Sequence, residues 1–84
     1  MHEYHIVEGI VKQAAKTARD NGASRVTKVT LAVGPFSGLE ESSVRLYFDS
    51  ISEGTPAEGA ELVINPTETG KELYIENIEI ESPG

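Results

Sequence analysis

A stripe of apolar side chains near the N-terminus limits the possible folds of this chain more than any other feature. Its members, spaced by three or four residues, are Val7, Ile10, Val11, Ala14, Ala15 and Ala18. This spacing places them on one face of an α-helix and predicts a helix from Tyr4 to about Asp20. Gly22, after Asn21, supplies the left-handed conformation that commonly ends a helix. An amphipathic helix must bury its stripe against a second layer.

After the first helix comes a segment with the two-residue period of a strand, and then a segment with the period of a helix. Apolar residues alternate over residues 25–33 and predict a β-strand, whose buried face holds Val29, Leu31 and Val33. A helical stripe comes next, formed by Val44, Tyr47, Phe48 and Ile51. Ser37 and Glu40, three residues apart, match a capping box at its start. Gly and Pro in residues 53–59 end that helix, and residues 62–64 predict a short second strand.

The last strand, predicted over residues 72–81, changes phase in its middle. The apolar residues at odd and then even positions are Leu73, Ile75, Ile78 and Ile80. In an uninterrupted strand these two pairs would point to opposite faces. One extra residue repairs the phase, so we expect a β-bulge or a kink at Glu76-Asn77 that turns all four toward the helices.

The order helix, strand, helix, strand, strand predicts an α+β domain, with two helices on one face of a three-stranded sheet. A right-handed crossover makes the first two strands parallel. The third strand is expected to form an antiparallel hairpin with the second, and its position at the edge or between the others stays open. A chain of 84 residues supports one domain, covering residues 1–84.

Charge and composition restrict the classes of function. Seven Lys and Arg against 14 Asp and Glu give a net charge of −7, which disfavours nucleic acid and anionic membrane surfaces as partners. The chain has no Cys, so metal ligands must come from His, carboxylates or backbone nitrogen. The apolar runs are too short for a transmembrane span or a signal peptide, and we expect a cytoplasmic protein.

The first five residues, Met1-His2-Glu3-Tyr4-His5, form the sharpest candidate site. The α-amine, the amide nitrogen of residue 2 and the His2 imidazole can close adjacent chelate rings, and a further amide nitrogen completes a square. Square-planar nitrogen sets suit nickel(II) and copper(II). A frayed, solvated terminus is the alternative. His5 is a candidate fifth ligand, an outer-shell base or an exposed polar residue, while the Glu3 side chain suits either an outer shell or the helix dipole.

No enzyme site is predicted. Residues 34–38 lack the lysine and the spacing of a phosphate-binding loop, and a turn explains them. Both His residues lie within the first five positions, so the serines have no evident base for nucleophilic catalysis. The glutamates along the last strand are explained as a solvated face.

Several segments together resemble the HypA/HybF nickel metallochaperones. The resemblance covers nearly the whole chain and is carried by the Met-His-Glu start, Gly22-Ala23, residues 25–31, Val33-Gly34, Ser37-Gly38, Gly54-Thr55, residues 58–62 and the last strand at 71–81. It implies a nickel(II) site made of the Met1 amine, the His2 amide and imidazole nitrogens, and the Glu3 amide. It also implies two partners, a HypB-type GTPase and the large subunit of an apo nickel enzyme such as [NiFe] hydrogenase, to which nickel passes by ligand exchange.

The sequence departs from that family at two places. Relatives carry a four-cysteine zinc ribbon between the second and third strands, where this chain has only a short turn at residues 65–70, so no zinc is expected. The chain is therefore either a natural short relative or an engineered deletion, and the clean excision favours the latter. His5 also stands where many relatives have Ser.

A metal-independent function is the competing hypothesis. A three-stranded sheet has edges, and the domain would then associate with itself as a homodimer, or with another protein, through an edge or its acidic face. Lys28 and the neighbouring glutamates are the residues expected to guard those edges.

Overall fold

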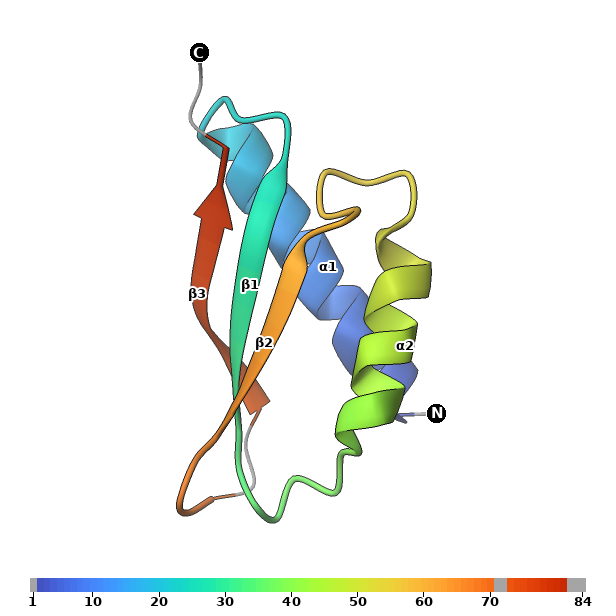
Figure 1. The fold of residues 1–84 in the computed structure, drawn as a ribbon, viewed down its shortest axis with the longest axis vertical. Coiled ribbons are helices and arrows are strands. Elements are labelled where there is room, and N and C mark those ends of the chain that lie inside the picture. Colours follow the sequence, from blue (N-terminus) through green and yellow to red (C-terminus); the bar gives the residue numbers. More distant parts are fainter. Residues whose placement is uncertain (1, 71–72, 82–84) are drawn as a thin grey trace.

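A computed structural model of the chain describes residues 2–70 and 73–81 (Figure 1). The elements are α1 (His2–Asp20), β1 (Val26–Val33), α2 (Glu41–Ser52), β2 (Glu61–Pro66) and β3 (Leu73–Ile80). Their order and type confirm the predicted α+β domain. Figure 1 shows α1 running diagonally behind the sheet with α2 beside it. Within the described ranges, neither helix has the length and apolar character needed to cross a membrane.

The sheet has the order β2-β1-β3, with β1 parallel to β2 and antiparallel to β3. The parallel crossover is as predicted, but the expected hairpin between β2 and β3 is wrong, because β3 pairs with β1 on its far side. The reason lies in the burial of β1, where Val29, Leu31 and Ala32 are all 0% exposed. A hairpin of β2 with β3 would have left one edge of this most apolar strand unpaired.

The phase change in β3 is accommodated by the predicted bulge. Thr30 of β1 pairs with Asn77, and the next residue, Leu31, pairs with Ile75, so Glu76 is the extra residue. The four apolar residues that pack against the core on either side of it are Leu73, Ile75, Ile78 and Ile80. The bulge therefore lets both halves of β3 contribute to one core.

The core lies between the sheet and the two helices. Phe48 of α2 is its largest fully buried side chain and is 1% exposed. The residues of α1 that reach this core are Val7, Ile10, Val11, Ala14 and Ala18, as the helical stripe predicted.

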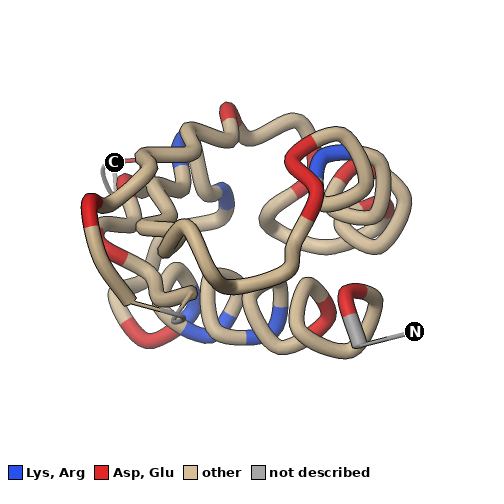
Figure 2. Tube along the Cα trace, turned by 90° about the horizontal axis from the view of Figure 1, so that it is seen from below, with Lys and Arg blue, Asp and Glu red and all other residues tan. Residues whose placement is uncertain are grey.

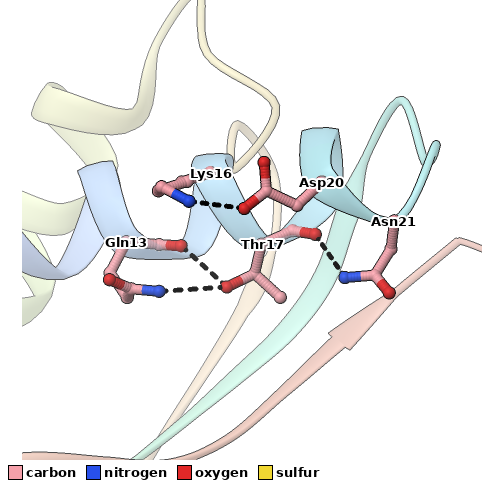
Figure 3. Close-up of polar contacts among 5 residues, drawn as sticks. All are labelled: Gln13, Lys16, Thr17, Asp20 and Asn21. Atoms are coloured by element: carbon pink, nitrogen blue, oxygen red, sulfur yellow. Dashed lines mark hydrogen bonds and ion pairs between the residues drawn. The ribbon is translucent and has the colours of Figure 1, made fainter.

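Side chains near the C-terminal end of α1 bond to one another and to the helix backbone (Figure 3). Thr17 Oγ1 donates to the Gln13 carbonyl at 2.9 Å and accepts from Gln13 Nε2 at 3.2 Å. Asn21 Nδ2 donates to the Thr17 carbonyl at 2.8 Å, and the same carbonyl also accepts from Asn21 N at 3.2 Å. Lys16 and Asp20 form an exposed ion pair at 2.5 Å.

Gly22 ends α1 in the manner that the sequence predicts. Its φ is +72°, and two backbone bonds close the helix, from Gly22 N to the Arg19 carbonyl at 3.1 Å and from Ala23 N to the Ala18 carbonyl at 2.8 Å. This is a Schellman motif, and buried Ala18 and Ala23 are the positions that form its apolar contact.

Replacing Gly22 is expected to destabilise the domain. Gly22→Ala should lower the free energy of unfolding by about 1 kcal/mol, because an L-residue is strained at positive φ. Gly9→Ala is the matched control: Gly9 lies inside α1 with open space around its Cα, so the alanine should raise stability by about 0.5–1 kcal/mol. Urea denaturation measures both, and a shift of the same sign in both variants would contradict this account.

Candidate metal site at the N-terminus

The predicted metal-binding residues lie at the beginning of α1. The helix starts at His2, whereas Met1 and the His2 side chain lie outside the described part of the structure. The first four N–H groups of a helix have no intrahelical acceptor. The amide nitrogens of residues 2 and 3, which the proposed chelate needs, are therefore not committed to the hydrogen bonds of α1.

The Glu3 side chain connects the start of α1 to the start of α2. Its Oε2 atom accepts a hydrogen bond from the backbone N–H of Glu40 at 3.0 Å. Glu40 is the N-cap residue of α2, so this contact joins two helix beginnings that are far apart in the sequence. With its carboxylate engaged in this way, Glu3 is suited to contribute its amide nitrogen rather than a side-chain oxygen.

Aromatic contacts also connect the first turn of α1 with α2. The Tyr4 ring lies edge-to-face with Tyr47 of α2, with the ring centroids 5.7 Å apart. It has a similar arrangement with His5, at 5.9 Å. Edge-to-face pairs of this kind are favoured by the quadrupoles of the rings. Tyr4 lies outside the apolar stripe of α1, whereas its partner Tyr47 was predicted in the apolar stripe of α2.

His5 points into solvent, with its side chain 78% exposed and its Nδ1 atom 3.9 Å from Glu8 Oε1. Positions three apart are neighbours on a helix surface, so position 5 lies beside position 2. In the part of the chain that the structure describes, no three His, Cys, Asp or Glu residues come together as a metal-binding group.

The capping box predicted for α2 is wrong. The N-cap is Glu40, and no side chain bonds the first turn from that position. Ser37 Oγ instead accepts from Leu39 N at 3.3 Å, before the helix begins. The physical reason is Gly38, whose φ of +77° turns the chain between Ser37 and the helix and leaves Ser37 too far upstream to cap it.

The arrangement defines a class of small α+β domain in which a long first helix presents a His-Glu start beside the N-cap of the second helix. The family described as hydrogenase/urease nickel incorporation, metallochaperone, hypA matches residues 1–70. The chain belongs to this HypA family.

Individual relatives agree with this assignment. The hydrogenase maturation factor HypA of Caldanaerobacter subterraneus is 44% identical over 63 residues, which are 75% of this chain and 55% of the relative. The factor of the same name from Aquifex aeolicus is 36% identical over 91 aligned positions, covering 100% of this chain and 79% of the relative. The chain thus spans little more than half the length of some curated relatives that it matches.

A solved structure has the same fold. The solution structure of the Ni metallochaperone HypA from Helicobacter pylori superimposes with a TM-score of 0.84, covering 95% of this chain and 97% of that one. The two sequences are 15% identical over the superposition, so this likeness concerns the fold alone.

Proposed function

We propose that this chain is a nickel(II)-binding domain that holds the ion at its N-terminus for delivery to a maturing nickel enzyme. The Met1 amine, the His2 amide and imidazole nitrogens and the Glu3 amide form the nickel site. Membership of the HypA family is the observation that supports this most directly. The start of α1 at His2 adds support, because the required amides there have no partner within the helix.

Nickel leaves such a site by ligand exchange. A chelate at the exposed end of a helix is open to an incoming protein, whose ligands replace its nitrogens one at a time. His5, one turn further along α1 and exposed, is placed to act as an additional ligand or as an outer-shell base. A domain of this kind binds and transfers the ion and carries out no covalent chemistry of its own.

The partners in this proposal are a HypB-type GTPase and the large subunit of an apo nickel enzyme, such as [NiFe] hydrogenase or urease. Relatives of the chain are named as hydrogenase maturation factors, and the family description adds urease. The proposal includes a cytoplasmic location without nucleic acid or membrane as a partner, and the net charge of −7 supports the exclusion of these two partners.

Residues 1–84 act as one nickel-binding domain, with the turn at 65–70 in place of a zinc ribbon and without bound zinc. The family match ends at residue 70, within the connection where the ribbon is expected in relatives. The connection is compact, since Thr67 N donates to the carbonyl of Val33 at 2.9 Å, at the end of the central strand.

The affinity for nickel is expected to fall steeply with pH. Binding must displace protons from an imidazole and an α-amine, whose reference pKa values are about 6.5 and about 7.7–8.0, and also from amides. A calorimetric nickel(II) titration at about pH 8 and about pH 5.5 should therefore give strong binding at the higher pH and little at the lower one. Equal affinity at both values would rule out the terminal chelate.

The competing function is a metal-independent, self-associating module. It is motivated by the sheet order, which leaves β2 and β3 as the outer strands. Sedimentation with and without nickel(II) separates the two proposals. A homodimer that forms equally without metal, in a chain that binds no nickel, would favour the module.

A further inference from the structure

A hollow of about 230 Å³ lies at the end of the sheet where β1 and β2 both terminate. The apolar residues that line it are Val33, Pro35, Leu39, Val44, Ile64 and Pro66. They come from the ends of the parallel strands, the loop after β1 and the first turn of α2. The carboxyl ends of parallel strands are where open α/β sheets usually bind ligands.

Backbone hydrogen bonds hold the walls of this hollow in place. Phe36 N donates to the Gly70 carbonyl at 3.1 Å, and Ser37 N donates to the Gly34 carbonyl at 3.2 Å. The loop is thus attached to the turn that follows β2 on one side. On the other side it reaches Glu40, whose N–H bonds to Glu3 in α1. The hollow is consequently preformed and lies close to the proposed metal site.

Phe36 stands at the rim of the hollow and faces solvent. Pro35 and Ser37, its neighbours in sequence, both line the hollow, whereas the Phe36 side chain is 72% exposed, more than any other large hydrophobic residue described. An exposed aromatic ring beside an apolar recess is typical of the anchor points of protein interfaces.

The size of the hollow favours a protein side chain over a free ligand. Small-molecule sites usually enclose about 300–1,000 Å³ and contain several converging polar groups. This hollow is smaller, and among the described residues that line it only Glu41 and Ser37 have polar side chains. One aliphatic or aromatic side chain of a partner would fill it.

The charge around the hollow favours a basic partner over a second copy of this chain. The acidic residues near the hollow are Glu40, Glu41 and Glu68. Arg45 pairs with Glu41 at 3.1 Å, so three acidic side chains stand against one basic side chain. Figure 2, a view from this end of the molecule, shows acidic positions at the start of α2 and beside the N-terminus. Two copies that met through this surface would bring like charges together.

We propose that this hollow and the Phe36 ring form the docking site for the protein that exchanges nickel with the chain, through an apolar side chain flanked by Lys or Arg. This inference rests on the proposed function. The loop after β1 leads to Glu40, whose N–H bonds to Glu3 in α1, and this contact brings the docking site close to the proposed nickel site. A partner seated there has its own metal ligands within reach of the N-terminus.

The test measures the affinity of the full chain for two purified proteins, the HypB-type GTPase and the apo-enzyme large subunit. Phe36→Ser should weaken binding of at least one of them about tenfold or more, as expected for an aromatic anchor. Leu46→Ser is the matched control, since Leu46 is also a large exposed hydrophobic residue, at 67%, but does not line the hollow. It should change affinity less than twofold. The wild-type affinity should also fall between about 0.05 and about 0.3 M salt.

Nickel titration of the same variants separates this inference from the proposed function. Phe36→Ser with normal nickel affinity and weakened partner binding supports docking at the hollow. If neither partner's affinity depends on Phe36, or if salt leaves the affinity unchanged, the docking proposal is overturned even when nickel binding is intact. If no variant and no wild-type chain binds nickel, the proposed function fails whatever the partner data show. Dimerisation lost in Phe36→Ser would instead assign the hollow to a second copy.

Discussion

A variant with one residue added before Met1 is expected to lose nickel(II) binding, with the affinity falling roughly hundredfold or more. The added residue moves the α-amine away from the amide of residue 2 and the imidazole of His2, which breaks the adjacent chelate rings. His2→Ala should have an equal effect because it removes the imidazole. Loss of an outer-shell partner alone already costs 10–100-fold in metal affinity, so loss of a direct ligand should cost at least as much.

Calorimetry and visible absorption measure this loss, and the wild-type chain should show one nickel(II) ion with a square-planar spectrum. A residue appended after Gly84 is the matched control, since it lengthens the chain equally and leaves the amine in place. Equal nickel binding by the native chain, the N-terminal extension and His2→Ala would exclude the terminal site. The HypA resemblance would then describe the fold only.

Phe48→Ala is expected to lower the free energy of unfolding by about 3–5 kcal/mol, because it removes a large buried side chain and leaves a cavity between α2 and the sheet. Single domains are usually stable by only about 5–15 kcal/mol, so this variant should be close to unfolding at room temperature. Urea denaturation followed by circular dichroism gives the value.

Phe36→Ala provides the control for that experiment with the same chemical change. Phe48 is 1% exposed and Phe36 is 72% exposed, so the second substitution should change stability by less than about 0.5 kcal/mol. Similar losses in the two variants would show that Phe36 is packed in solution and would contradict the described position of its ring.

Local patterns predicted the elements of this fold but not all of their pairings. Three features depend only on residues that are close in sequence, and the local pattern therefore predicts them. They are the apolar stripe of α1, the end of that helix at Gly22 and the extra residue in β3. The pairing of β3 with β1 depends on which strand is buried most deeply in the whole core, and no local pattern near residues 65–70 encodes that. The capping box failed because Gly38 changes the direction of the chain between Ser37 and α2.

In the candidate site, too, the sequence predicts features made by consecutive residues but not contacts between distant ones. The Met-His-Glu start is visible in the sequence, since its chelating atoms are consecutive. The hydrogen bond from Glu40 N to Glu3 joins residues 37 positions apart and has no sequence signature. The contact of Tyr4 with Tyr47 likewise depends on the crossing of two helices, which the apolar stripes alone do not determine.

The strand order has a mechanical consequence for anything inserted between β2 and β3. These strands flank β1, so their adjoining ends are separated by two strand spacings, about 10 Å, rather than by one. A module inserted there would be joined to the domain by two connections, one on each side of the central strand. Such an attachment resists twisting about a single hinge, so movements of the module would be transmitted to both edges of the sheet together.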